Sequence, residues 1–316
     1  MYCNLHFFFL KPEKFFSFHA DIAFCCQWAF LLKTGIFTKP HFRVQCLPPL
    51  FGGKRPCRVS VFLAQPVAVP RIFSIANQKG GVGKTTTAIT LADGLAKAGA
   101  KTLLVDLDPQ CNATSGLGIE PTSEHPLVSA TPIPQAVVAT SVADLWMLPG
   151  SRSFADVELL ARGDETEARR MEEQMIRQIQ GYDFVLIDCP PSLGRLTQIA
   201  LTASTEVLMP IQCEFFAMEG LVQMIEVIRG VMERQPERLQ FGGIVLTMYD
   251  HSLELTHEVD REVRDFFGEI VFDTVIPRDV SISEAPSHGK SIIEYAPRSR
   301  GARAYIELCM EVLERV

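Results

Sequence analysis

From residue 71 onward the sequence lacks the cysteine patterns that build metal centres or disulfide frameworks. None of its four cysteines forms a C-x-x-C pair, and no histidine stands at ligand spacing from one of them. A zinc site and a disulfide scaffold are therefore not indicated, and we expect buried, reduced thiols, as in a cytoplasmic protein. The four cysteines are Cys111, Cys189, Cys213 and Cys309.

The first 70 residues lack a hydrophobic run long enough to cross a bilayer. Their apolar run at residues 22–32 has eleven residues, whereas a membrane helix needs about 20. A run of this length could form the core of a signal peptide, but no small-residue cleavage site follows it.

The chain from residue 71 also lacks an excess of positive charge. Residues 1–70 hold eight Lys and Arg against two Asp and Glu, although the whole chain has a net charge of −7. The remainder therefore has 22 basic and 35 acidic residues, a net charge of −13. A domain of this charge does not wrap nucleic acid by bulk electrostatics, so a DNA contact would need a local basic patch.

Residues 1–70 differ in composition from the rest of the chain. They hold 12 of the 21 Phe and five of the nine Cys, without a sustained helical or alternating pattern. Three interpretations are open: a non-native extension translated from a wrongly chosen start, a disordered but native arm, or a targeting segment. We favour the first, and we predict an extension at residues 1–70, disordered or non-native, followed by one domain at residues 71–316.

What the sequence does contain from Arg71 onward is a regular alternation of strands and helices. Residues 72–76 form an apolar run, a helical stripe follows at Ala88, Leu91, Ala92 and Leu95, and residues 102–106 form a second apolar run. Strand, helix and strand within about 35 residues make a βαβ unit with parallel strands. Further strands are predicted at residues 184–188, 207–211, 244–247 and 270–272. The predicted fold is α/β: a single doubly wound, mostly parallel sheet flanked by helices, with its ligand at the carboxyl ends of the strands.

A glycine-rich segment lies between the first predicted strand and helix. Glycines let backbone N–H groups converge on phosphate oxygens, and the N-terminus of the following helix adds positive potential. Lys84 is placed to reach the β- and γ-phosphates, and the Thr85 hydroxyl to coordinate Mg²⁺. The pattern therefore predicts a P-loop, although Gln78 stands where the strict pattern has glycine. Its residues are Lys79, Gly80, Gly81, Val82, Gly83, Lys84, Thr85 and Thr86.

This P-loop, with Lys79 near its start, resembles the deviant P-loop of the ParA/MinD superfamily. Most of the chain from Arg71 resembles the ParA/Soj partitioning ATPases, whereas residues 1–70 match no family. The resemblance rests on the stretches at residues 76–79 (ANQK), 105–110 (VDLDPQ), 188–194 (DCPPSLG), 210–214 (PIQCE), 246–250 (LTMYD), 275–278 (VIPR), 283–286 (SEAP) and 299–301 (SRG).

The resemblance implies a homodimer that sandwiches two ATP molecules, with ATP and Mg²⁺ as cofactors. Lys79 would then reach across to the partner's nucleotide, and Asp108 would position the attacking water. Asp188 would hold Mg²⁺ together with Thr85, while Asp106 is interpreted as a structural residue or an outer-shell group of the metal. The resemblance also implies adenine contacts. These fall on Pro277 and Asp279, although the family often has asparagine at position 279.

By the same resemblance, we expect action in chromosome or plasmid segregation with a ParB-like protein that stimulates hydrolysis, in the cytoplasm and associated with the nucleoid. Family members that bind DNA without sequence preference often carry arginines where this chain has Ser252 and Ser281, so we expect weak non-specific DNA binding. The basic residues left nearby are Arg261, Arg264, Arg278, Arg298, Arg300 and Arg303.

Three rival functions are less well supported. A MinD-like switch on a membrane or protein surface would need a basic amphipathic C-terminal helix for a bilayer, whereas residues 311–316 are mixed in charge. We therefore expect no membrane partner. An iron–sulfur reductase would need cluster cysteines between residues 112 and 188, where none occurs. A scaffold without turnover is disfavoured because Lys84, Thr85, Asp108 and Asp188 are all present.

Overall fold

The structure is a computed structural model. The chain divides into two compact units, Met1–Ala68 with Ala98–Ala100, and Val69–Lys97 with Lys101–Val316. The apolar run at residues 22–32 lies outside the described residues. The structure describes residues 2–8, 15–21, 42–47, 58–63, 70–129, 131–154, 165–214, 217–234 and 238–315.

Two pairs of antiparallel strands lie in the first unit. β1 (Tyr2–Phe8) pairs with β2 (Phe15–Asp21), and β3 (Phe42–Leu47) pairs with β4 (Arg58–Leu63). The sequence analysis predicted no strands in this region. That residues 1–70 are a disordered or non-native extension stays a prediction.

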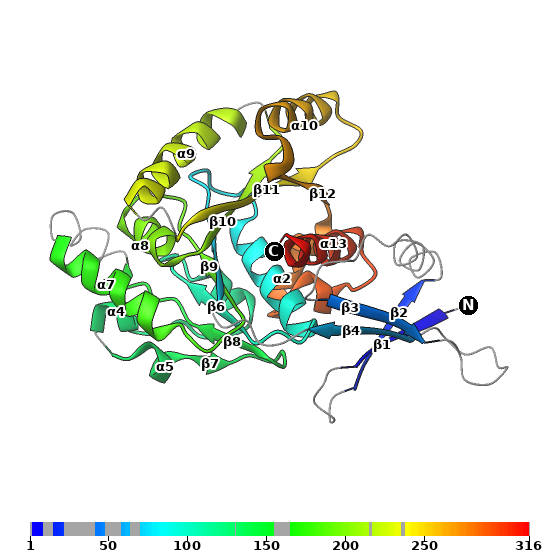
Figure 1. Ribbon diagram of the computed structural model, residues 1–316, viewed down its shortest axis with the longest axis horizontal. Helices are drawn as coiled ribbons and strands as arrows, with labels where there is room; N and C mark the ends of the chain where they lie inside the picture. Colours follow the sequence, from blue (N-terminus) through cyan, green and yellow to red (C-terminus); the bar gives the residue numbers. More distant parts are fainter. Residues whose placement is uncertain are drawn as a thin grey trace. The chain divides into compact units, whose positions relative to one another are not determined.

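The second unit is built on one eight-stranded sheet, in the order β12-β11-β10-β5-β9-β6-β8-β7 (Figure 1). All neighbouring strands run parallel except β7 and β8, which pair antiparallel. The predicted doubly wound, mostly parallel sheet is confirmed. Its strands are β5 (Arg71–Ile75), β6 (Thr102–Asp106), β7 (Val138–Ala139), β8 (Leu145–Leu148), β9 (Phe184–Asp188), β10 (Glu206–Gln212), β11 (Gln240–Tyr249) and β12 (Val271–Pro277).

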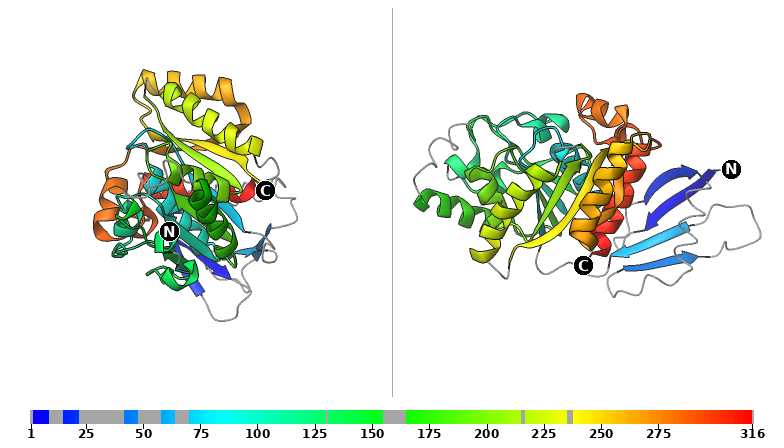
Figure 2. Two further views of the ribbon diagram at one scale, coloured as in Figure 1. Left: turned by 90° about the vertical axis from the view of Figure 1, so that its left-hand side faces the viewer. Right: turned by 90° about the horizontal axis from the view of Figure 1, so that it is seen from above.

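Helices cover both faces of this sheet (Figures 1 and 2). α7 (Glu165–Gln178), α8 (Arg195–Ala203), α9 (Ala217–Arg234) and α10 (Glu254–Phe267) lie on one face, and α2 (Lys84–Lys97) and α13 (Arg300–Glu314) lie on the other. Shorter elements complete the unit: α3 (Asn112–Gly116), α4 (Pro126–Ser129), α5 (Ile133–Ala136), η1 (Gly268–Ile270), α11 (Val280–Glu284), η2 (Ala285–His288) and α12 (Ile292–Tyr295).

The helical stripe predicted from the sequence is the buried face of α2. Ala88, Leu91, Ala92 and Leu95 are each completely buried, because a spacing of three and four residues places them on one side of the helix. This packing fixes α2 against the sheet and therefore fixes the glycine-rich segment that leads into it.

β11 is longer than the sequence predicted, because its two glycines form a bulge and not a turn. The pairing between β10 and β11 shifts register at Gly242, and the strand continues through Gly243 with φ at +150°. A Cβ atom at Gly243 would lie 2.4 Å from the ring of Phe272. The glycine therefore lets the aromatic ring of the edge strand β12 pack closely on β11.

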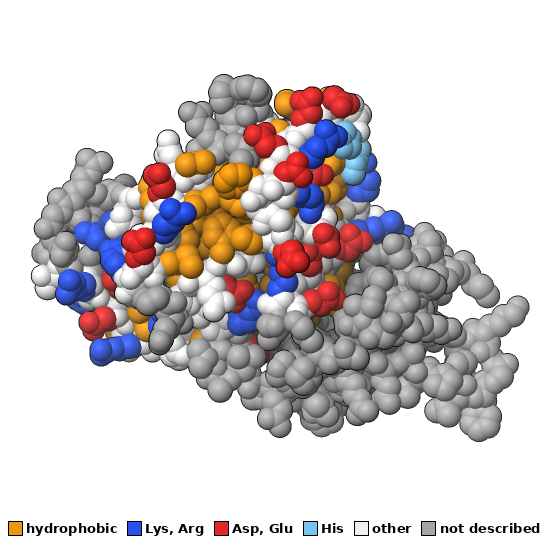
Figure 3. Space-filling model, turned by 45° about the horizontal axis from the view of Figure 1, so that its top comes forward, with side chains coloured by type: hydrophobic (Ala, Val, Ile, Leu, Met, Phe, Trp, Pro, Cys, Tyr) orange, Lys and Arg blue, Asp and Glu red, His pale blue; other side chains and the backbone are white. Residues whose placement is uncertain are grey.

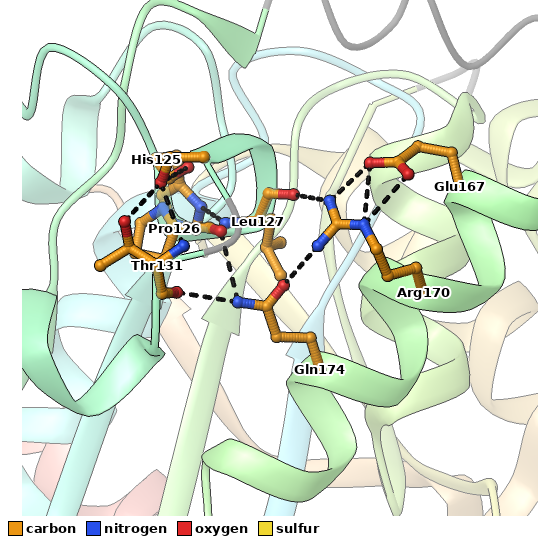
Figure 4. A network of polar contacts seen from close by, with 8 residues as sticks. His125, Pro126, Leu127, Thr131, Glu167, Arg170 and Gln174 are labelled. Carbon is orange, nitrogen blue, oxygen red and sulfur yellow. Dashed lines mark hydrogen bonds and ion pairs between the residues drawn. The ribbon is translucent and has the colours of Figure 1, made fainter.

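Residues 119–143 contain the short elements α4, α5 and β7. Arg170 and Gln174 of α7 form hydrogen bonds to backbone carbonyls of this region (Figure 4). Gln174 Nε2 donates to the carbonyls of Pro126 and Thr131, and Arg170 donates to the carbonyl of Leu127. Long polar side chains thus replace the backbone pairing that a short helix cannot supply.

Among the helices of the described residues, none is both long and apolar enough to span a membrane.

Candidate active site

The glycine-rich segment connects β5 to α2 at the carboxyl edge of the sheet. Gly81 and Gly83 have φ values of +76° and +91°, in the left-handed region that side chains with a Cβ rarely adopt. Apart from each glycine itself and its two chain neighbours, no heavy atom of the described residues lies within 4 Å of where a Cβ of Gly80 or Gly81 would stand. The loop therefore borders open space into which its backbone N–H groups can reach, as a phosphate cradle requires.

Strand register brings two acidic residues to this loop. Asp188 pairs with Ile75, the last residue of β5, and also with Asp106, the last residue of β6. Because three parallel strands end side by side here, residues more than 80 positions apart in the sequence meet at one edge.

Asp188 is completely buried, and neither of its carboxylate oxygens has a hydrogen-bond partner among the described residues. Burial raises the pKa of this carboxyl well above its usual value, and the neighbouring Asp106 carboxylate raises it further. The Thr85 hydroxyl lies near enough to lower the pKa, but it makes no hydrogen bond of ordinary geometry with Asp188.

A buried carboxylate without a partner costs free energy unless a cation or a donor satisfies it. Mg²⁺ prefers carboxylate and hydroxyl oxygens and keeps several water ligands. The Asp188 carboxylate, which has no partner among the described residues, therefore fits a Mg²⁺ site together with the nearby Thr85 hydroxyl.

Asp106 has a structural role, which is one of the two interpretations drawn from the sequence. Its Oδ2 accepts hydrogen bonds from the backbone N–H and the hydroxyl of Thr114, and its Oδ1 accepts one from Asp108 N. A Cβ atom at Gly150 would lie 2.9 Å from the carboxyl carbon of Asp106. Burial raises the pKa of Asp106 to about 6, against the effect of these hydrogen bonds. Asp106 therefore shapes the turn that carries Asp108.

Asp108 lies two residues beyond the end of β6 and is 5% exposed. Its Oδ1 accepts a hydrogen bond of 2.8 Å from Gln110 N, so the turn fixes its carboxylate. Burial raises the pKa of Asp108, while the Gln110 hydrogen bond and the charge of Lys84 lower it. A carboxylate held in place beside the P-loop lysine is in a position to orient a water molecule.

The two lysines of the loop contact one another through the backbone. Lys84 Nζ donates to the carbonyl of Lys79 at 2.9 Å, and Lys79 Nζ forms an ion pair of 2.7 Å with Glu214 Oε2. Burial lowers the pKa of Lys84, against the nearby Asp188 carboxylate. No role for Glu214 was predicted from the sequence, although this residue lies in one of the stretches that carry the family resemblance.

A cavity of about 440 Å³ adjoins the loop. It lies between the first turns of α2 and the short elements α3 and η2. Sequence analysis identified only its two threonines as site residues; the signal for the η2 wall was the SEAP stretch. The cavity is lined by Thr85, Thr86, Ile89, Asn112, Ser115, Gly116, Pro286 and Ser287.

Pro277 and Asp279, which the sequence analysis assigned to adenine, do not line this cavity. Pro277 ends β12, and Asp279 is the N-cap residue of α11. Asp279 Oδ1 accepts a hydrogen bond from Ser281 N, which caps α11, and Oδ2 accepts one from Gly301 N in the first turn of α13. Both carboxylate oxygens therefore hold the local fold, and the adenine assignment stays a prediction.

Comparison with known proteins supplies the family. A family model described as an AAA domain matches residues 70–241. The chain is 45% identical to the sporulation initiation inhibitor protein Soj of Bacillus subtilis, over 77% of this chain and 98% of Soj. It is 44% identical to the chromosome partitioning protein ParA of Caulobacter vibrioides, over 78% of this chain and 94% of ParA.

Solved structures share the fold. Cobyrinic acid a,c-diamide synthase from Mycobacterium smegmatis, crystallised with an ATP analogue and magnesium, superposes with a TM-score of 0.67 at 32% identity, over 78% of this chain and 95% of that one. The septum site-determining protein MinD from Pyrococcus horikoshii, complexed with Mg-ADP, gives 0.63 at 28% identity, over 77% and 96%. The chain has the P-loop and the strand-end acids, and its relatives are more than 40% identical. It therefore belongs to the ParA/Soj family of partitioning ATPases.

Proposed function

We propose that this protein is a Mg²⁺-dependent ATPase that dimerises with ATP and acts in chromosome or plasmid segregation, with a ParB-like partner that stimulates hydrolysis. The observation that carries the proposal is the buried carboxylate of Asp188 beside the P-loop, which has no hydrogen-bond partner in the part of the chain that the structure describes. Family membership supports the biological role. The proposed place of action is the cytoplasm, at the nucleoid.

The site residues have distinct proposed roles. The loop N–H groups of residues 80–83 and the ammonium of Lys84 bind the phosphates, with Thr86 in the next position of the helix. Thr85 and Asp188 hold Mg²⁺, which supplies charge neutralisation at the phosphate oxygens. Asp108 orients the attacking water.

Lys79 is proposed to reach across to the nucleotide of a second protomer and neutralise charge in the transition state. Pro277 and Asp279 remain the proposed adenine contacts.

Non-specific DNA is the proposed surface on which the ATP-bound dimer acts, with weak affinity. On the face drawn in Figure 3, basic side chains are interspersed with acidic ones and form no large positive area. The expectation that Arg264 could serve a DNA patch loses support. Its Nε pairs with Asp260 at 2.6 Å and its Nη2 donates to Phe272 O, so the guanidinium holds α10 to β12.

The alternative is a MinD-like or other cargo-positioning switch on a membrane or protein surface. A bilayer is disfavoured by the contacts of the C-terminal helix α13. Its Glu311 accepts hydrogen bonds from the N–H groups of Asp273 and Thr274, and its Val312 and Leu313 are buried. This helix belongs to the core of the unit.

The proposal is tested by Asp188→Asn in the full chain. Asparagine has nearly the same shape but is a poor Mg²⁺ ligand, so we expect the stabilisation by ATP with Mg²⁺ to be lost. Without nucleotide, the unfolding midpoint should be equal to or above that of the wild type, because a buried carboxyl is removed. Thermal unfolding with and without Mg·ATP measures both, with the exposed Asp265→Asn as the matched control. Full stabilisation of Asp188→Asn by Mg·ATP would contradict the metal role.

A further inference from the structure

Three contacts arrange the start of the P-loop beside the end of β10. Asn77 Nδ2 donates to Pro210 O at 2.8 Å, and Asn77 Oδ1 accepts from Lys79 N at 2.9 Å. The third contact is the ion pair between Lys79 Nζ and Glu214 Oε2, at 2.7 Å. The first two involve backbone groups and shape the loop, whereas the third fixes only the direction of the Lys79 side chain.

The carboxylate of Glu214 is itself oriented. Gln212 Nε2 donates to its Oε1, and Glu214 N donates to Gln212 O at 2.8 Å. Its other oxygen, Oε2, is the one that meets Lys79. The glutamate is therefore aimed at the lysine by the strand end that carries it.

The ion pair is placed where it can break. The side chains of Lys79 and Glu214 are 34% and 47% exposed, and ion pairs in such surroundings are weak because water competes for both charges. A competing phosphate group carries more negative charge than one carboxylate and offers several acceptor oxygens. The Lys79 ammonium would therefore bind the phosphate in place of Glu214.

We infer that Glu214 is a positioning residue that holds Lys79 within its own protomer until a second protomer presents its nucleotide. The inference rests on the proposed function, in which Lys79 reaches across a dimer. In the structure described, Lys79 Nζ is bound in cis, so dimerisation must exchange Glu214 for the partner's phosphates.

Nucleotide loading would weaken the hold on Lys79 before dimerisation. Lys84 Nζ, the proposed phosphate ligand, donates to the carbonyl of Lys79 at 2.9 Å. Phosphates that draw this ammonium away would free the Lys79 carbonyl. ATP binding and dimerisation would thus release the lysine in two steps, and the Glu214 contact is the second.

The test is Glu214→Gln in the full chain, which removes the charge and keeps the shape. We expect the dissociation constant of the ATP-dependent dimer to fall about two- to fivefold, the size of an exposed ion pair. The affinity of the protomer for ATP should not change, because Glu214 does not contact Lys84. A catalytically blocked background, Asp108→Ala, keeps ATP intact during analytical ultracentrifugation.

A double-mutant cycle separates positioning from a structural effect. In a Lys79→Gln background, Glu214→Gln should have no further effect on dimerisation, since there is no ammonium left to hold. Glu173→Gln, which breaks an exposed ion pair with Arg177 on α7, is the control and should change nothing.

Unchanged or weaker dimerisation of Glu214→Gln would overturn the inference, as would an equal effect in the Lys79→Gln background. A different failure belongs to the proposed function: if the Asp108→Ala protein with wild-type Glu214 does not dimerise with ATP, the dimeric switch itself is wrong.

Discussion

At the scale of single residues, substitutions of Lys84 and Asp108 should affect different steps of the ATPase reaction. Lys84→Ala removes the charge opposite the β- and γ-phosphates, so we expect nucleotide binding to be lost. Asp108→Ala leaves the cradle intact, so it should bind ATP and dimerise while turnover falls by about 10²-fold or more. Equilibrium binding and steady-state ATP hydrolysis distinguish the two, and unchanged turnover in Asp108→Ala would remove this residue from the mechanism.

His125 is a buried residue whose protonation should set part of the acid sensitivity. Its ring packs on Phe154 with centroids 4.2 Å apart, and its Nδ1 accepts from Leu127 N. Burial lowers the pKa of His125 to about 3, against about 6.5 in the unfolded chain. Between these two values the unfolded state binds the proton and the folded state does not. The free energy of unfolding therefore falls as pH is lowered through this range.

His125→Asn should flatten this dependence, because the amide oxygen can still accept from Leu127 N but does not titrate. Between pH 6.5 and 5 we expect the wild type to lose about 2 kcal/mol more than the variant. Urea unfolding at several pH values measures this difference. The variant is expected to be less stable at pH 7, since the ring packing is lost. The test therefore compares how steeply the free energy of unfolding changes with pH, and not its value at one pH. Parallel slopes would show that His125 titrates normally.

At the scale of elements, the edge strand β12 is protected by Glu311 of α13 and by Arg315, the residue that follows this helix. Glu311 accepts the N–H groups of Asp273 and Thr274, and Arg315 donates to the carbonyls of Ile270 and Val271. Two oppositely charged side chains thus occupy backbone groups that could otherwise pair with another chain.

Glu311→Ala should expose this edge. We expect the free energy of unfolding to fall by about 1 kcal/mol, because the exposed N–H of Asp273 and the half-buried N–H of Thr274 lose their acceptor. We also expect aggregation on heating to increase, since the freed edge can pair with another copy. Urea unfolding and light scattering measure the two effects. Glu307→Ala, an exposed position on the same helix, is the control, and equal behaviour of the two variants would show that Glu311 does not protect the strand.

At the scale of the whole molecule, net charge and dimerisation act against one another in DNA binding. The part from residue 71 has a net charge of −13, whereas an ATP dimer presents two copies of any basic patch and gains avidity. We therefore expect ATP-dependent, non-specific DNA binding with a shallow salt dependence, because few phosphate contacts release few counterions.

Arg261→Glu is the variant that tests this surface, since Arg264 is engaged with Asp260. We expect the variant to weaken binding to non-specific duplex, and Arg229→Glu on α9 to serve as the control. Binding should be titrated against salt with ATP and with ADP. No binding with ATP at low salt would contradict the DNA role and favour a protein or membrane surface.

Local features of the sequence determined much of this protein. The glycine spacing before Lys84 predicted the loop. The apolar runs at residues 102–106 and 184–188 predicted two central strands, and their bounds are those of β6 and β9. The family assignment is confirmed by relatives above 40% identity. These features are readable because strand and helix periodicity, and the left-handed backbone of glycine, are properties of neighbouring residues.

Only the tertiary structure decided which distant groups meet. The pairing of Lys79 with Glu214, 135 positions away, and the engagement of Arg264 by Phe272 O have no local signature in the sequence. The same holds for α3, which forms one wall of the cavity, and for the lack of a partner for the Asp188 carboxylate among the described residues. These contacts follow from the order of strands in the sheet and from side-chain packing, both of which bring together residues that periodicity treats as independent.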